Sequence, residues 1–244
     1  MAAAPDFSGT DSALVALSGG VDSTVLLHLA KEAGIRVEAA CVVSEFTAES
    51  DLSVARLSAE KEGVPFHELR ISLLSDKKIV QNTSERCYLC KKKMADALVS
   101  FAEKQGLSAV FEGTNADDGI RPGLRALQEA GVKSPLRKFS KAEIISFAKK
   151  AGLPVRPPSS CLATRVPTGS PLSKEKLSLV SRAETALRQN GISGILRVRL
   201  LGDSVRGKTA VRIEVEPGCM KPAVFFEETL NALGIEVQSV ELYK

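Results

Sequence analysis

The sequence predicts an α/β protein with a doubly wound parallel sheet, followed by a smaller α+β domain. The first two-thirds of the chain alternates short apolar runs with segments of helical period. This pattern is typical of βαβ units, whose parallel sheet is covered by helices on both faces. The last third has a long amphipathic helix and two segments that alternate apolar with charged residues, as strands with one exposed face do.

The expected elements follow in chain order. In the first domain, residues 1–158, apolar runs predict strands over 13–17, 37–43, 66–71 and 109–112. Apolar residues spaced three or four apart predict helices over 23–33, 51–62, 91–105 and 141–151. The proline-rich segment Leu153–Ser160 favours neither element and marks the exit from this domain. In the second domain, residues 159–244, we expect a helix over 173–189, strands over 195–201 and 209–216, a helix over 222–233 and a last strand over 236–242.

Composition narrows the class of protein. A chain of 244 residues with 44% hydrophobic and 25% charged residues is that of an ordinary globular protein with a sizeable core. It has no apolar stretch of membrane-spanning length and no signal peptide, so we expect a cytoplasmic protein without a membrane partner. Its five cysteines then favour thiol or metal chemistry over disulfides. Cys41, in an apolar strand, and Cys219, after a Pro-Gly turn, are expected only to fill space.

Six residues after the first strand form the most informative motif, Ser18-Gly19-Gly20-Val21-Asp22-Ser23. The glycines let backbone N–H groups approach phosphate oxygens, the serines add hydroxyl donors, and the following helix presents its N-terminus to the anion. A carboxylate beside phosphates needs a cation between them, so we expect Asp22 to contact Mg²⁺. A small-residue turn that caps a helix explains only part of this string. The string resembles the PP-loop of the N-type ATP pyrophosphatases.

A second polar string, Glu112–Asp118, follows the fourth expected strand. It lies at the carboxyl edge, where a doubly wound sheet binds its ligands. Asn115 is therefore a candidate contact for nucleotide or substrate, and Asp117 or Asp118 is a candidate to share the cation of Asp22. An Asx-rich turn that caps the next helix is the alternative for one of these two aspartates.

A third motif matches a known phosphate-binding pattern, but its context argues against that function. Gly202–Thr209 fits G-x-x-x-x-G-K-T at every position. That pattern needs a following helix, whereas residues 210–216 alternate small or apolar with charged side chains and end at Pro217-Gly218, as a strand does. We therefore predict a hairpin loop here, without a helix N-terminus for phosphates.

Three cysteines are candidates for chemistry. Cys87 and Cys90 form a C-x-x-C pair before a basic helical stretch, and Cys161 lies far downstream within Ser159–Arg165. The pair alone is compatible with a redox couple, half of a zinc site or two buried thiols. Three thiolates also suit an iron–sulfur cluster in which one iron lacks a protein ligand and can take an exogenous sulfur or substrate atom.

The loop at residues 18–23, the string Glu112–Asp118 with Arg121-Pro122-Gly123, and the string Ser160–Arg165 together resemble the LarE family of pyridinium-biscarboxylate sulfurtransferases. The resemblance spans nearly the whole chain. It implies an adenine nucleotide alpha hydrolase-like first domain and a small-molecule substrate, pyridinium-3,5-biscarboxylic acid mononucleotide. ATP with Mg²⁺ adenylates each carboxylate, pyrophosphate leaves, and sulfur displaces AMP to give a thiocarboxylate for the nickel-pincer cofactor. We also expect a homo-oligomer.

The cysteines distinguish two branches of that family. In the better-known branch, the cysteine that matches Cys161 is itself the sulfur donor and ends as dehydroalanine. This sequence departs from that branch by adding Cys87 and Cys90, and the three-cysteine pattern is associated in the family with an oxygen-sensitive 4Fe-4S cluster that carries the extra sulfide. We therefore expect Cys87, Cys90 and Cys161 to bind such a cluster and stay intact. Sacrifice of Cys161 is the alternative.

The resemblance also raises three arginines to candidate substrate contacts. Arg197 and Arg199 lie two apart on an expected strand, so both project from one face, and Arg165 lies four residues after Cys161. Guanidinium groups suit a substrate phosphate or carboxylate. A solvated strand face is the alternative. Two acidic residues, Glu184 and Glu214, are expected to bind a metal or to orient those arginines.

Other functions remain possible on the sequence alone. Some PP-loop enzymes that thiolate tRNA also carry C-x-x-C and an iron–sulfur cluster, but they need a strongly basic surface or an added RNA-binding domain. The net charge of +4 is small for this length, so we expect no nucleic-acid partner. An amide-forming ligase would use ammonia and would not need three cysteines. A non-catalytic nucleotide-binding module is the remaining class.

Overall fold

The computed structural model of this chain describes residues 5–119, 121–205 and 207–243, without the side chains of residues 203–205. It divides into two compact units. The first comprises Met1–Ser72 and Cys87–Arg156, and the second comprises Leu73–Arg86 and Pro157–Lys244. Each unit is described by itself below.

The first unit is an α/β domain with a four-stranded sheet. The strands run in the order β3-β2-β1-β4, and every neighbouring pair is parallel. They are β1 Ser12–Ala16, β2 Arg36–Val43, β3 Phe66–Arg70 and β4 Ala109–Phe111. The helices are α1 Val21–Glu32, α2 Glu49–Glu62, α4 Arg86–Lys104, α5 Pro122–Glu129 and α6 Lys141–Lys150.

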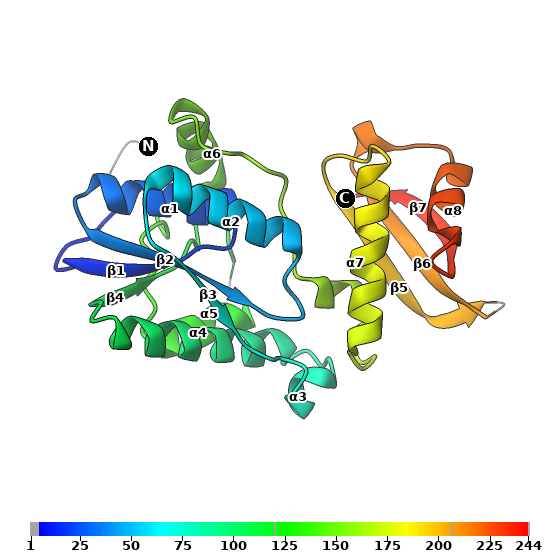
Figure 1. The fold of residues 1–244 in the computed structure, drawn as a ribbon, viewed down its shortest axis with the longest axis horizontal. Helices are drawn as coiled ribbons and strands as arrows, with labels where there is room; N and C mark the ends of the chain where they lie inside the picture. The colour runs from blue at the N-terminus through cyan, green and yellow to red at the C-terminus, as the bar shows by residue number, and fades with distance from the viewer. Residues whose placement is uncertain (1–4, 120, 206, 244) are drawn as a thin grey trace. The chain divides into compact units, whose positions relative to one another are not determined.

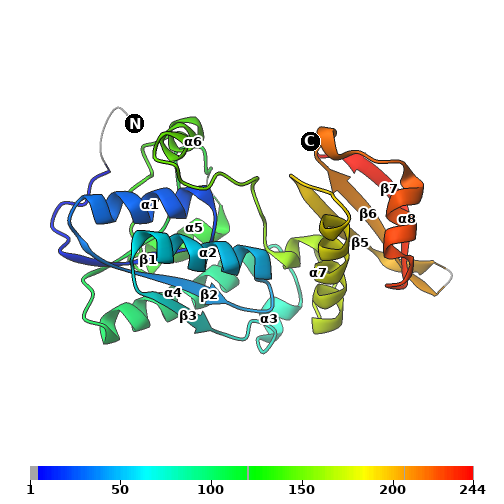
Figure 2. The ribbon, with the colours of Figure 1, turned by 45° about the horizontal axis from the view of Figure 1, so that its top comes forward.

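Helices cover both faces of this sheet, as the near-continuous apolar strands predict. Successive residues of β1 point to opposite faces: Ala13 and Val15 pack with α1, α2 and α6, whereas Leu14 packs with α4 and α5. Figures 1 and 2 show α1 and α2 on one side of the sheet and α4 on the other. The fold class is therefore the one predicted.

The order of the strands indicates where a ligand is expected to bind. After β3 the chain crosses to the other side of β1 and forms β4, so the direction of winding reverses between β1 and β4. In open α/β sheets, ligands bind at the carboxyl ends of the strands at such a switch point. The segments that leave these two strands are the glycine-rich loop at residues 17–20 and the polar string that begins at Glu112.

The second unit has a three-stranded sheet in the order β5-β6-β7. β5 pairs antiparallel with β6, and β6 pairs parallel with β7. Helix α7 contacts β5 and α8, and α8 contacts β7 (Figure 1). The elements are α3 Lys77–Val80, η1 Leu162–Arg165, α7 Lys174–Gln189, β5 Leu196–Val205, β6 Lys208–Val215, η2 Pro217–Cys219, α8 Ala223–Asn231 and β7 Ile235–Leu242.

The motif Gly202–Thr209 begins in β5 and ends in β6, which pair antiparallel as a hairpin, and a strand rather than a helix follows Gly207, as predicted. Lys208 donates to the side-chain oxygen of Asn231 at 2.7 Å. The structure also differs from the expectations in places. Helix α4 begins at Arg86 rather than residue 91, so the C-x-x-C pair lies inside its first turn. The short elements α3, α5, η1 and η2 were not expected, because each is too short to show a periodic pattern.

The segment Leu73–Arg86 belongs with the second unit, although it lies between two elements of the first in the sequence. Long-range hydrogen bonds explain this placement. The N–H of Leu172 donates to the carbonyl of Val80, and that of Gly169 to the carbonyl of Asn82, each at 2.8 Å. Over the described ranges, no helix is both long and apolar enough to cross a membrane.

Candidate active site

The glycine-rich loop between β1 and α1 is closed by its two serines. The backbone N–H of Ser18 donates to Oγ of Ser23 at 3.2 Å, and that hydroxyl donates to the carbonyl of Gly20 at 3.0 Å. Gly20 is the N-cap of α1, and no side-chain hydrogen bond caps this helix end. The first N–H groups of α1, from Val21 onward, therefore point out of a tight loop, as at helix N-termini that bind phosphate.

Gly19 allows the loop to pass close to α2. Its φ is +76°, and a Cβ at this position would lie 2.3 Å from the carbonyl oxygen of Asp51. Both observations require glycine, because an L side chain is strained at this φ and the neighbouring atom is backbone. Gly20 differs: its φ is −82°, and the nearest atom to an added Cβ is Oγ of Ser18 at 3.5 Å.

These two glycines give a matched pair of variants. Replacing Gly19 with Ala should lower the free energy of unfolding of the nucleotide-free protein by about 2 kcal/mol or more, from backbone strain and displacement of α2. Replacing Gly20 with Ala should cost no more than about 1 kcal/mol, because its backbone conformation does not require glycine and only the better N-cap residue is lost. Urea denaturation followed by fluorescence of a bound dye or by circular dichroism measures both. Equal costs would contradict this account of Gly19.

Asp22 and Asn115 meet near the carboxyl ends of β1 and β4. The side-chain N–H of Asn115 donates to Oδ1 of Asp22 at 3.1 Å, and Asn115 is 3% exposed. The other oxygen of Asp22 is paired with the ammonium of Lys141, the first residue of α6. Lys141 offsets the charge of the carboxylate beside the phosphate loop. Sequence analysis missed it, because a lysine at the start of a distant helix carries no local signal.

The two aspartates after Asn115 are engaged in the turn itself. Asp118 accepts from the N–H of Asn115 at 3.1 Å and pairs with Arg121, and Asp117 accepts from the N–H of Lys141 at 2.7 Å. These contacts place both aspartates in an Asx-rich turn, although no side-chain hydrogen bond caps the next helix, α5. Arg121 is thus the charged partner of Asp118, whereas Lys141 is that of Asp22.

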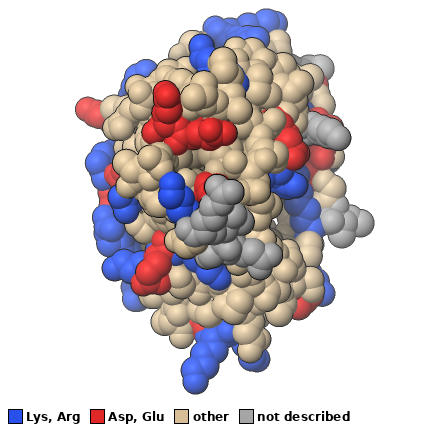
Figure 3. Space-filling model, turned by 90° about the vertical axis from the view of Figure 1, so that its right-hand side faces the viewer, with Lys and Arg blue, Asp and Glu red and all other residues tan. Residues whose placement is uncertain are grey.

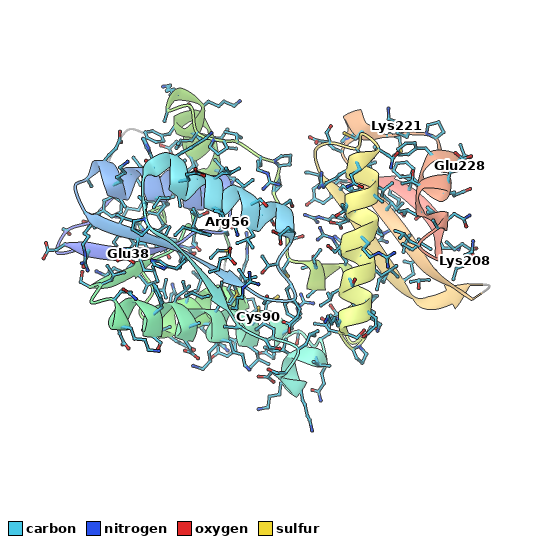
Figure 4. The ribbon with its side chains drawn as sticks, in the orientation of Figure 1. Glu38, Arg56, Cys90, Lys208, Lys221 and Glu228 are labelled. Atoms are coloured by element: carbon cyan, nitrogen blue, oxygen red, sulfur yellow. The ribbon has the colours of Figure 1, made fainter. Side chains whose placement is uncertain are left out.

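The C-x-x-C pair lies in the first turn of α4. Cys87 is exposed and Cys90 is half-buried, with its sulfur 3.8 Å from that of Met94 (Cys90 is labelled in Figure 4). Tyr88, between them, donates to the carboxylate of Glu129 at 2.6 Å, and this bond raises the pKa of the Tyr88 hydroxyl. The guanidinium of Arg125 lies 4.3 Å from the ring centre of Tyr88. Helix α5 thus holds the turn that carries both thiols.

Cys161 lies in the second unit, exposed at the N-cap of the short helix η1. Its loop is held by Arg165, which is 4% exposed. The guanidinium of Arg165 donates to both oxygens of Glu184, at 2.6 and 3.3 Å, and to the hydroxyls of Ser160 and Thr164, at 2.6 and 2.8 Å. Arg165 is therefore a buried anchor of the Cys161 loop.

The two candidate arginines of β5 differ in their contacts. Arg199 donates to Glu214 at 2.6 Å and to the carbonyl of Thr164 at 2.8 Å, so it also holds the loop. Arg197 projects from the same face, with its guanidinium 4.3 Å from the ring centre of Tyr243. Val198, between them, is fully buried on the other face, as the alternation predicts. Glu214 orients Arg199 as Glu184 orients Arg165, which is one of the two roles that we expected for these acids.

Metal-binding geometry is not assembled in the part of the chain that the structure describes: no group of three or more His, Cys, Asp or Glu residues there is placed to hold an ion.

The two remaining cysteines, Cys41 and Cys219, differ from the three candidates. Burial raises the pKa of the Cys41 thiol to about 11, which disfavours the thiolate needed for chemistry. The thiol of Cys219 donates to the carbonyl of Ser193 at 3.0 Å.

Comparisons with known proteins give the context of these features. The family model described as queuosine biosynthesis protein QueC matches residues 12–122, the part that carries the glycine-rich loop and Asn115. An uncharacterized protein of Synechocystis sp. is 34% identical over 218 residues, which cover 86% of this chain and 79% of that protein. A tRNA-cytidine(32) 2-sulfurtransferase of Bdellovibrio bacteriovorus is 27% identical over 173 residues, 62% of this chain and 67% of that enzyme.

A more informative relative covers nearly the whole chain. The pyridinium-3,5-bisthiocarboxylic acid mononucleotide synthase of Lactiplantibacillus plantarum is 33% identical over 240 residues, which cover 93% of this chain and 84% of that enzyme. Identity at this level includes both units, so it reaches the Cys161 loop as well as the phosphate loop. The chain is thus an ATP-dependent PP-loop enzyme, and it belongs to the family of that synthase, the LarE family.

Proposed function

We propose that this enzyme adenylates the carboxylates of pyridinium-3,5-biscarboxylic acid mononucleotide and converts them to thiocarboxylates. A carboxylate oxygen attacks the α-phosphorus of ATP, the bond to the β-phosphate breaks, and pyrophosphate leaves. A sulfur nucleophile then attacks the acyl carbon, and AMP leaves with the former carboxylate oxygen. The observation that carries this proposal is the phosphate loop with Asp22 and Asn115 at the switch point, in a chain that matches the synthase over 93% of its length.

The first unit supplies the groups for adenylation. The loop at residues 18–23 and the N-terminus of α1 bind the leaving pyrophosphate through backbone N–H groups and two hydroxyls. Asp22 would hold Mg²⁺, which is typically bound by one or two carboxylates together with substrate phosphates. Asn115 fixes the position of that carboxylate, and Lys141 balances its charge. We retain Asp118 only as a candidate for a second contact to the ion.

The sulfur donor is the second part of the proposal. The donor chemistry of Cys87, Cys90 and Cys161 fits a 4Fe-4S cluster, because all three are thiols and two of them are exposed. When bound, such a cluster would supply the sulfur that replaces the carboxylate oxygen. Cys87 and Cys90, three residues apart, lie on one face of α4, so one helix presents both thiols. Sacrifice of the Cys161 sulfur is the alternative.

The second unit supplies candidate substrate contacts. We propose that Arg197 and Arg199 bind the phosphate or a carboxylate of the substrate, since both project from one face of β5 and Arg199 contacts the loop of Cys161. Arg165 holds that loop in place, and Glu184 and Glu214 orient the arginines rather than bind a metal.

A tRNA thiolase is the second candidate, favoured by the 27% identity to the tRNA-cytidine(32) 2-sulfurtransferase. Binding of RNA requires a surface dominated by lysine and arginine. On the face drawn in Figure 3, lysines and arginines lie among aspartates and glutamates. The net charge of +4 agrees with this mixed surface. Both observations support the small-molecule substrate.

One assay distinguishes these functions. Purified enzyme is incubated anaerobically with ATP, Mg²⁺ and either the pyridinium biscarboxylate mononucleotide or bulk tRNA, and pyrophosphate release is measured. We expect AMP and pyrophosphate only with the mononucleotide, in equal amounts. Release that depends on tRNA would overturn the proposal, and so would release of ADP and phosphate.

A further inference from the structure

The buried side chain of Asn82 connects two segments of the second unit. Asn82 is 0% exposed and has a φ of +55°, the only positive value outside glycine among the residues that the structure describes. A left-handed backbone is strained even for asparagine, and it persists where the surrounding contacts determine it. The contacts of its own side chain do so here.

Both polar atoms of the Asn82 side-chain amide make hydrogen bonds. The side-chain nitrogen of Asn82 donates to the carbonyls of Pro167 and Ser170, at 2.8 and 2.9 Å. Its side-chain oxygen accepts from the guanidinium of Arg86, and its backbone carbonyl accepts from the N–H of Gly169 at 2.8 Å. Asn82 therefore ties the chain that precedes the C-x-x-C pair to the chain that follows Cys161.

Arg86 continues this connection to the cysteines. The guanidinium nitrogen that binds Asn82 also donates to the carbonyl of Ala163 at 3.1 Å. Ala163 is buried in η1, the short helix whose N-cap is Cys161. Arg86 is the residue directly before Cys87. The side chain of Arg86 thus links the start of the C-x-x-C turn to η1, the helix whose N-cap is Cys161.

We propose that Asn82 and Arg86 are positioning residues for the sulfur-transfer half of the reaction. They fix the segment that leads into the C-x-x-C turn against the loop of Cys161. The proposal rests on the proposed function, since it matters only if thiols from both segments serve one reaction. Groups that act together must be held in a fixed geometry by residues that are themselves fixed. Asp22 and the phosphate loop lie in the other unit, so adenylation should not depend on this connection.

The test measures how readily Cys87 and Cys161 are bridged. In a background with Cys41→Ala, Cys90→Ser and Cys219→Ser, the remaining thiols react with dibromobimane, in which each thiolate displaces one bromide and fluorescence follows the second displacement. We expect intramolecular bridging in this background, slowed at least about tenfold by Arg86→Gln, which removes the contact to Ala163. Asn82→Asp should slow it similarly, because a carboxylate oxygen would face two carbonyl oxygens. Arg86→Lys should retain part of the rate, because it keeps one donor.

Arg36→Gln is the matched control. Arg36 also donates to two backbone carbonyls, those of Gln105 and Gly106, but in the first unit. It should leave bridging within about twofold, as a surface substitution does. Bridging that is absent in the background, or unchanged by Arg86→Gln in a chain with native circular dichroism, would overturn the inference. Failure of the proposed function is seen separately, as a lack of pyrophosphate release with the mononucleotide in the wild-type enzyme.

Discussion

Replacing Asp22 with Asn should lower the rate of ATP–pyrophosphate exchange about a thousandfold, the upper end of what one charge-stabilising group contributes to a transition state. The reason is electrostatic. Asparagine keeps the size of the side chain and can still bind Asn115, but it cannot neutralise and place a divalent cation beside the phosphates. The substitution also leaves the ammonium of Lys141 without its anion. Exchange of labelled pyrophosphate into ATP, in the presence of the mononucleotide and Mg²⁺, measures this half-reaction alone.

Two further variants show whether the effect comes from the metal. Asp11→Asn removes an exposed carboxylate next to the amino end of β1, opposite to the phosphate loop, and should change exchange by less than about twofold. Lys141→Gln removes the other half of the ion pair and keeps Asp22. If Asp22 acts through Mg²⁺, Lys141→Gln should be milder than Asp22→Asn, and the Mg²⁺ concentration for half-maximal exchange should rise only in the Asp22 variant. Exchange within tenfold of wild type in Asp22→Asn would refute this role.

Local patterns were sufficient to predict most of the fold. The strands β1, β2 and β3 begin within one residue of the expected positions. For β1 and most of β2 the signal is a run of small and apolar residues, which a buried parallel strand needs. The phosphate loop was equally predictable. Its residues are adjacent in the sequence. The close approach of the loop to α2 requires glycine at position 19, and that glycine is visible in the sequence.

The rest depends on contacts between residues far apart in the chain. The ion pair of Lys141 with Asp22 joins two residues far apart in the chain, and the sequence around either residue does not predict it. The burial of Arg165 also depends on distant residues, because the carboxylate of Glu184, together with the hydroxyls of Ser160 and Thr164, satisfies its donors. The segment that contains Asn82 joins the second unit through carbonyl and amide contacts that no periodic pattern encodes.

Replacing Cys161 with Ala should abolish thiocarboxylate formation and leave ATP–pyrophosphate exchange within about twofold of wild type. The two half-reactions separate because the groups for adenylation lie in the first unit, whereas Cys161 starts η1 in the second. A small exposed side chain at an N-cap without a side-chain hydrogen bond contributes little to folding, so the variant should remain native. Cys219→Ser is the matched control, since it removes another thiol of the same unit and should leave both half-reactions intact.

Intact mass after turnover then distinguishes the two sulfur sources. If Cys161 binds a cluster, the anaerobically purified wild-type chain should keep its mass after several turnovers, and Cys87→Ala and Cys90→Ala should lose iron and sulfur transfer together with Cys161→Ala. If Cys161 is the donor itself, the chain should lose the elements of hydrogen sulfide after one turnover, and Cys87→Ala should still support that turnover. The position of Cys161 is compatible with both chemistries, because an exposed thiol at the start of η1 is open to a cluster and to an acyl adenylate alike. The two sulfur sources therefore differ in what they require of Cys87 and Cys90. These two thiols, in the turn that Tyr88 and α5 hold, take part in sulfur transfer only if a cluster is the donor.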